Sequence, residues 1–278
     1  FFKAQDGIRD SVASRGLGDV YKRQIQNIST TDQTGVIFDR TIPSMTTISI
    51  VSDNDYYSDL AKVGDQLTLE FTSTESIQTP DVMLGGLEAD VSGDSVTWSG
   101  AKLMTIYDIE GDVSIMIEYM DMAGNQGIPD TITTDATSVI FDMTSPALSV
   151  SIISDNQTPS LAKPEDEVTL TFVSNELLYE PPTVTIDGNN QVVSPQIQAT
   201  DYSASRTMAV EDTQGEISFV IGSIMDRAGN VTTDISMTTD TSSVIFDSVL
   251  PTITDLYIVS SNNFDNDNTS SVAKAGDT

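Results

Sequence analysis

The chain has 278 residues, of which 12 are lysine or arginine and 42 are aspartate or glutamate, giving a formal net charge of −30 at pH 7. So acidic a surface excludes nucleic-acid and anionic-membrane binding, which need basic side chains. The absence of cysteine and histidine excludes disulfides, thiolate metal sites and histidine-based acid–base catalysis, and no apolar run approaches the ~20 residues of a membrane helix.

Residues 1–24 differ in composition from the rest of the chain and contain five of the 12 basic residues. Ser14–Gln24 resembles one translated frame of a transposase end used in sequencing libraries, and Ala4–Asp10 resembles a flow-cell adapter frame. We therefore expect residues 1–24 to be a disordered adapter-translation artefact from a metagenomic gene assembly. A basic arm or a signal region is the alternative, but a secretory signal needs an apolar stretch that this segment lacks.

The next part of the chain introduces a repeat. The phrase Val-Ile-Phe-Asp occurs three times, each time with a proline four residues after the aspartate; these aspartates are Asp39, Asp142 and Asp247. The turn Asp-x-Ala-Gly-Asn occurs at 121–125 and again at 226–230. Repetition with a period of about 100 residues predicts tandem modules that each form one structural unit.

The repeats also predict the boundaries of the modules. Residues 25–42 should be the last strand of a preceding module and its linker, residues 43–142 and 146–247 two modules, and residues 251–278 the truncated start of a third. Each boundary lies between a repeated aspartate and the proline that follows it, where the fixed φ of proline limits the hinge.

The modules read as β-strands along their length. Apolar and polar residues alternate at 67–71 and 113–119 in the first module and at 168–172 and 217–221 in the second. A period of two is typical of strands with one buried face. About seven short strands per module, separated by Gly, Asn and Asp turns, predict an all-β fold of tandem immunoglobulin-like sandwiches.

One irregularity is expected in the second module. It carries one residue more than the first between Ile221 and Asp226. An extra residue within a strand predicts a β-bulge there.

The Asp-x-Ala-Gly-Asn turn, the Phe-Asp…Pro junction and the Ala-Lys-x-Gly-Asp phrase at 61–65 resemble bacterial immunoglobulin-like repeat domains of large adhesin-like surface and secreted proteins. The resemblance covers residues 25–278 and implies an extracellular or cell-surface location. The sequence departs from it where Asp247 is followed by Ser-Val-Leu-Pro without threonine, and Trp98 has no apparent counterpart in the second module.

The acidic junctions are the candidate ion sites, because calcium takes six to eight oxygen ligands and needs neither histidine nor cysteine. The predicted ligands are Asp39, Asp53, Asp55, Asp121, Asn125, Asp142, Asp155, Asn156, Asp226, Asn230 and Asp247. The alternative is structural: the junction aspartates end strands and form Asx turns, and the Asp and Asn of each Gly-containing turn bond neighbouring amides. Glu75 and Glu176, at matching positions, are interpreted as solvated loop carboxylates rather than ligands.

We predict no catalytic residue and no enzyme, because no carboxylate pair stands out and the same positions recur in both modules. The predicted function is a structural or adhesive tract of a bacterial cell-surface or secreted protein. Its partners would be neighbouring modules and a surface ligand or glycan, without direct membrane insertion. The alternative is a set of carbohydrate-binding accessory modules of a secreted enzyme, in which Tyr56, Tyr57, Trp98 and Tyr107 would form a stacking platform.

Overall fold

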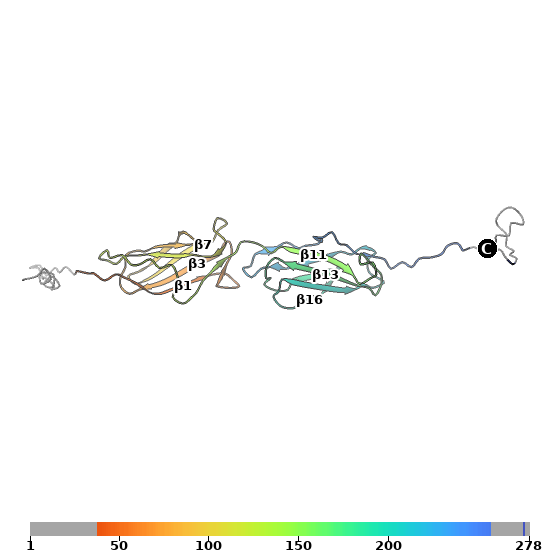
Figure 1. Cartoon of the computed structure of the whole chain (residues 1–278), viewed down its shortest axis with the longest axis horizontal. Helices are drawn as coiled ribbons and strands as arrows, with labels where there is room; N and C mark the ends of the chain where they lie inside the picture. The colour runs from red at the N-terminus through yellow and green to blue at the C-terminus, as the bar shows by residue number, and fades with distance from the viewer. Residues whose placement is uncertain (1–37, 257–274, 276–278) are drawn as a thin grey trace, which may run out of the picture. The chain divides into compact units, whose positions relative to one another are not determined.

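The computed structural model describes residues 38–256 and Ala275, so the predicted adapter segment and most of the two flanking partial modules lie outside the described residues. Residues 38–256 contain strands and no helix. They divide into two compact units (Figure 1), the first of residues 38–145 with Met225–Val231 and the second of residues 146–224 with 232–256. Each unit is described by itself below.

The first repeat contains ten strands. These are β1 (Met45–Ser52), β2 (Leu60–Ala61), β3 (Gln66–Ser73), β4 (Asp81–Leu84), β5 (Leu87–Glu88), β6 (Asp90–Asp94), β7 (Thr97–Leu103), β8 (Gly111–Asp112), β9 (Ile115–Glu118) and β10 (Ile140–Phe141). They form a four-stranded sheet β1-β3-β7-β6 and three-stranded sheets β5-β4-β9 and β2-β10-β8, in which only the β2–β10 pair is parallel. Strands β1, β3 and β7 lie side by side in Figure 1.

The second repeat has the same plan. Its strands are β11 (Leu148–Ser154), β12 (Leu161–Ala162), β13 (Glu167–Ser174), β14 (Thr183–Ile186), β15 (Asn189–Gln191), β16 (Val193–Ser194), β17 (Asp201–Thr207), β18 (Gly215–Glu216), β19 (Phe219–Gly222), β20 (Ile224–Met225), β21 (Val231–Thr232) and β22 (Ile245–Phe246). The sheets are β11-β13-β17-β16, β15-β14-β19 and β12-β22-β18, with a short β20–β21 pair. The strands exceed the expected seven per module because several last only two residues.

The alternation of apolar residues decides which face of each strand is buried. In β3, Leu67, Leu69 and Phe71 are at most 1% exposed, whereas Glu70 on the other face is exposed. The matching residues of β13 are equally buried. The predicted two-residue period is thus confirmed in both repeats.

The buried faces of the two main sheets meet in a single core per unit. In the first unit, Leu69 and Phe71 of β3 share one cluster with Val82 of β4 and Ile117 of β9. Two sheets packed face to face over alternating side chains are an immunoglobulin-like β-sandwich. The predicted fold class is therefore confirmed.

Trp98 does have a counterpart, contrary to the sequence reading. It lies opposite Phe71 in the β3–β7 register, and Tyr202 lies opposite Phe172 in the corresponding β13–β17 register. The Phe172 and Tyr202 rings stack with centroids 5.6 Å apart. The sequence did not reveal this correspondence, because the two repeats place different aromatic residues, tryptophan and tyrosine, at the same core position.

The expected irregularity falls at Ser223. This residue separates β19 from β20 and has a φ of 55°, in the left-handed region that non-glycine residues rarely adopt. The extra residue is accommodated at this break between β19 and β20, whereas the β14–β19 pairing before it is regular and contains no bulge.

A buried ion pair recurs in each repeat between the end of the third long strand and the loop after it. Lys102 pairs with Asp108, whose carboxylate also accepts a bond from the Thr105 amide at 2.7 Å. Arg206 pairs with Asp212 in the same way in the second unit. Burial opposes ionisation of Asp108, but the hydrogen bond from Lys102 prevails and lowers its pKa. Each pair joins the end of a long strand to the loop that follows it, and Arg206 also donates to the Ile186 main-chain oxygen at 2.9 Å.

Candidate metal centre

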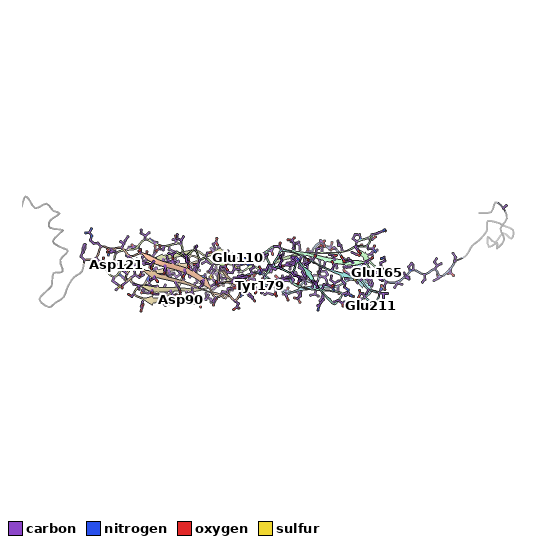
Figure 2. All side chains as sticks on the ribbon, turned by 90° about the horizontal axis from the view of Figure 1, so that it is seen from below. Asp90, Glu110, Asp121, Glu165, Tyr179 and Glu211 are labelled. Atoms are coloured by element: carbon purple, nitrogen blue, oxygen red, sulfur yellow. The ribbon has the colours of Figure 1, made fainter. Side chains whose placement is uncertain are left out.

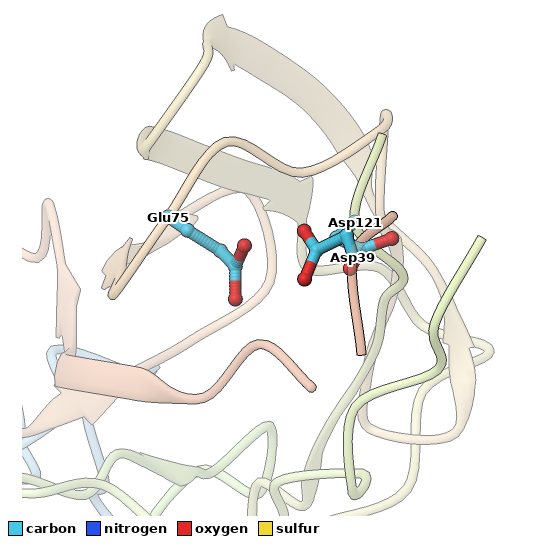
Figure 3. Close-up of side chains that lie close together, drawn as sticks. All are labelled: Asp39, Glu75 and Asp121. Atoms are coloured by element: carbon cyan, nitrogen blue, oxygen red, sulfur yellow. The ribbon is translucent and has the colours of Figure 1, made fainter. Parts of the chain in front are cut away.

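Three carboxylates gather at one end of the first unit. Asp39 precedes β1, Glu75 follows β3 and Asp121 follows β9, and one oxygen of each lies within 4.8 Å of the others. Figure 3 shows the Glu75 side chain on one side of the group and the Asp39 and Asp121 side chains together on the other. In Figure 2, Asp121 and Glu110 lie toward opposite ends of this unit, so the cluster is confined to one end.

Asp121 is the best-fixed member of this cluster. It is 1% exposed, and its Oδ1 accepts bonds from the amides of Ala123 and Asn125, each at 2.8 Å. Burial alone would raise its pKa, but the hydrogen bond from the Asn125 side chain and the turn amides lower the pKa overall. Asp121 is therefore held as a carboxylate at neutral pH.

Gly124 shapes the turn that supplies these amides. Its φ is +92°, and that of the matching Gly229 is +91°, a conformation that glycine adopts without steric strain. The structural interpretation of these turns is thus supported directly, while Asp121 also contributes to the carboxylate cluster.

Glu75 contributes more to the cluster than its sequence position indicated. Desolvation, followed by repulsion from Asp39 and Asp121, raises the pKa of Glu75. The sequence reading treated it as a solvated loop carboxylate, because its distance from Asp39 and Asp121 in space is not visible in a linear pattern.

Asp39 is also held by local contacts. Its Oδ1 accepts a bond from the Thr41 amide at 2.9 Å, and its main-chain oxygen accepts a long bond from Asn125 Nδ2 at 3.4 Å. The expected Asx turn is therefore present at Asp39.

The second repeat reproduces part of this arrangement. Carboxylate oxygens of Asp142 and Asp226 lie within 4.8 Å of each other, and Asn230 Nδ2 donates to the Asp142 main-chain oxygen at 3.1 Å. Desolvation raises the pKa of Asp142, and repulsion from Asp226 and Glu110 adds to this. Glu176, which matches Glu75 in the repeat, belongs to the second unit.

The remaining predicted ligands do not join these carboxylate groups among the described residues. Asp53 accepts from the Gln66 amide at 2.6 Å, and Asp155 accepts from the Glu167 amide at 2.8 Å. Asp247 accepts from the Val249 amide at 2.8 Å. Each of these three carboxylates thus has a main-chain amide as a local partner.

The other predicted ligands have different positions. Asp55 is exposed in the loop after β1, and Asn156 binds Asp166 through its side-chain nitrogen. Asn125 and Asn230 donate their side-chain amides to Asp121 and Asp226, so they orient carboxylates.

The proposed aromatic platform is not formed as a unit. Trp98 is 8% exposed in the core, with its Nε1 donating to the Ser95 main-chain oxygen at 3.3 Å, whereas Tyr107 is 85% exposed. The Tyr57 ring is covered by the Arg227 guanidinium at 4.6 Å. Trp98 is therefore a core residue and does not stand on an exposed face with Tyr107.

Within the part of the chain that the structure describes, no helix is long and apolar enough to span a membrane. No protein-family model matches the chain, and no curated protein matches it significantly.

Several solved structures are similar to the chain at low identity. They include the fibronectin(III)-like modules of Clostridium thermocellum CbhA, with a TM-score of 0.28, 11% identity, and coverage of 72% of this chain and 94% of that chain. Rst D1-D2 has a TM-score of 0.36 and 11% identity, covering 75% and 100%. DIP-gamma IG1+IG2 has a TM-score of 0.33 and 13% identity, covering 75% and 98%. Likeness at this level carries no information on function, and the sandwich assignment rests on the strands themselves.

Proposed function

We propose that this chain is a non-catalytic structural and adhesive repeat tract of a bacterial cell-surface or secreted protein, with calcium bound at a carboxylate cluster at the end of a module. The main support for the ion site is that one carboxylate oxygen from each of Asp39, Glu75 and Asp121 lies within 4.8 Å of the other two. The resemblance of the repeated phrases to bacterial surface modules supports the cellular setting.

Electrostatics favours a cation at this cluster. Two unit charges 4 Å apart repel by about 1 kcal/mol in water and by about 4 kcal/mol at an effective dielectric constant of 20. Asp121 remains ionised because its turn amides stabilise the carboxylate, and Glu75 responds with a raised pKa. A divalent cation relieves this repulsion, and calcium suits a set of carboxylate and main-chain oxygens.

The position of the ligands gives the ion a mechanical role. Asp39 belongs to the segment that leads into β1, while Glu75 and Asp121 follow strands of the sandwich itself. An ion bound by all three ties the leading segment to the module. The recurrence of Asp142, Glu176 and Asp226 in the sequence supports the same role in each repeat.

The test is thermal unfolding of the full chain in about 2 mM calcium and in excess chelator. A ligand that binds only the folded state at 100 times its Kd stabilises by about 2.7 kcal/mol, which raises the Tm of a 100-residue domain by roughly 10–20 °C. Glu75→Gln should remove most of the shift in the first unit, because the glutamine carries no charge. Magnesium should give a smaller shift, because it demands a more rigid octahedral site.

Glu70→Gln is the matched control. Glu70 is an exposed carboxylate on β3, five residues from Glu75, and it lies outside the cluster. It should leave the calcium shift unchanged. An equal Tm with calcium and with chelator, or an unchanged shift in Glu75→Gln, would contradict calcium binding at this cluster.

A further inference from the structure

The Asp-x-Ala-Gly-Asn turn of the second repeat is packed as part of the first unit, which includes Met225–Val231. Ala228 is 1% exposed, and its main-chain oxygen accepts a bond from Asn54 Nδ2 at 2.8 Å. A Cβ added at Gly229 would lie 2.6 Å from the Tyr56 ring. The Ala-Gly pair of this turn is therefore fitted closely by its neighbours.

We define the group of Asn54, Lys62 and Asp65 as the first cradle. Asn54 Oδ1 accepts from the Tyr56 amide at 2.9 Å, which fixes the orientation of the side chain. Asn54 Nδ2 donates to Asp65 Oδ2 at 2.6 Å, and the same oxygen accepts from the Lys62 amide at 2.8 Å. One amide hydrogen is thus used inside the cradle and the other binds the turn.

The second unit contains the same group of side chains, which we call the second cradle: Asn156, Lys163 and Asp166. Asn156 Nδ2 donates to Asp166 Oδ2 at 2.7 Å, and that oxygen accepts from the Lys163 amide at 2.9 Å. Asn156 Oδ1 accepts from the Thr158 amide at 3.0 Å. The Asn156 side-chain amide is therefore oriented like that of Asn54 in the first cradle. Its second Nδ2 hydrogen corresponds to the hydrogen that Asn54 donates to the Ala228 main-chain oxygen.

The two cradles differ in exposure. The Lys62 side chain is 26% exposed and the Lys163 side chain is 64% exposed. Asn54 is buried at 9% exposure, whereas Asn156 is half-buried. The second cradle thus presents to solvent the groups that the first cradle uses to hold a turn.

The first repeat supplies a turn of the matching shape. In the Asp121–Asn125 turn, Gly124 has nearly the same φ as Gly229, and Asn125 binds Asp121 as Asn230 binds Asp226. Ala123 and Gly124 are exposed, and a Cβ on Gly124 would meet nothing within 4 Å.

We propose that the second cradle of one molecule binds the Asp121–Asn125 turn of a second copy of this chain, head to tail. Contact between two different surfaces leaves a free turn and a free cradle at the ends, so association continues into open chains of molecules. The contact lacks the pairing of Arg227 with Tyr57, because Met122 replaces the arginine. We expect this contact to be weak, with a Kd on the order of 1 mM.

The experiment is a dilution series of the isotope-labelled full chain from about 1 mM to about 0.05 mM, followed by amide NMR spectra. Excess chelator removes any contribution of calcium, so the result is independent of the proposed ion site. Salt at about 0.5 M screens the repulsion between molecules of net charge −30. The Asn156 side-chain amide and the Ala123 and Gly124 amides should shift together with concentration.

Two variants interrupt the contact from opposite sides. Asn156→Ala removes the donor, and Ala123→Leu places a bulky side chain where the matching Ala228 is buried; each should abolish the concentration-dependent shifts. Asn189→Ala, at an exposed position of β15, should leave them intact. The absence of shifts at about 1 mM, or their persistence in Asn156→Ala, would overturn the proposal.

Discussion

Several aspartate side chains among the described residues accept hydrogen bonds from main-chain amides. Asp39, Asp142 and Asp247 each accept from the amide two residues later. Asp121 and Asp226 each accept from amides inside a turn. A chain with 42 acidic residues thus uses some of them to fix the geometry of its turns.

Asp166 shows how such an aspartate contributes to stability. Burial alone would raise its pKa, but hydrogen bonds from Lys163 and Asn156 lower the pKa from 3.8 to about 2. Because the folded-state pKa is depressed, the stabilisation is present above about pH 4 and is lost as the pH falls toward 2. We expect a loss of about 1 kcal/mol after allowing for the exposure of Lys163.

Urea unfolding of the second unit between pH 6 and pH 2, followed by amide exchange, measures this loss. In Asp166→Asn the stability should be lower at pH 6, and its decline between pH 4 and pH 2 should be smaller. The same decline in both proteins would show that other carboxylates are responsible.

At the scale of elements, the edge strand β1 is covered by side chains rather than by another strand. The Ile48 amide donates to Thr134 Oγ1 at 2.9 Å, and the Ile50 amide donates to Thr137 Oγ1 at 3.0 Å. The Thr134 main-chain amide in turn donates a hydrogen bond to the Ile48 main-chain oxygen. Edge amides are sites for pairing with other chains, so these hydroxyls protect the sheet from edge-to-edge association.

Thr134→Val tests this cover with a side chain of nearly the same shape. It should destabilise the first unit by about 1–3 kcal/mol, because the buried Ile48 amide loses its acceptor. The measurement is the urea midpoint, with the exchange rate of the Ile48 amide as a local readout. Thr97→Val, at an exposed position of β7, is the control and should change stability little; equal effects of both variants would contradict the assigned role.

At the scale of the whole molecule, two separate cores stabilise the described chain. The first contains Leu69 and Phe71, the second contains Leu170 and Phe172, and no buried residue is common to both clusters. Each core lies between its own pair of sheets, so cavities made in one should act on that unit.

Leu69→Ala and Leu170→Ala form a matched pair, because both leucines are 0% exposed and hold the same register in β3 and β13. Each should destabilise its own unit by about 2–5 kcal/mol. Amide exchange should increase in β11, β13 and β17 for Leu170→Ala and in β1, β3 and β7 for Leu69→Ala. Equal loss of protection in both sets of strands for either variant would show that the cores unfold together.

The sequence alone was sufficient to predict the fold class and which residues of each strand are buried, because a period of two is a local property of a strand. It also predicted the turn at Gly124, which depends on neighbouring residues, but it expected a β-bulge where the structure has a break between two strands at Ser223. Tyr202 was missed as the partner of Phe172, because a register joins residues far apart in the chain.

The candidate ion site was likewise predictable from the sequence only in part. The sequence selected Asp39 and Asp121 from their recurrence, and it also selected Asp53 and Asp155, which lie outside the carboxylate groups and accept bonds from strand amides. Only the tertiary structure brought Glu75 to Asp39 and Asp121, since three loops separated by 36 and 46 residues meet through the packing of two sheets. Residue types and local periodicity can be obtained from the sequence, whereas the proximity of carboxylates far apart in the chain depends on how the two sheets pack.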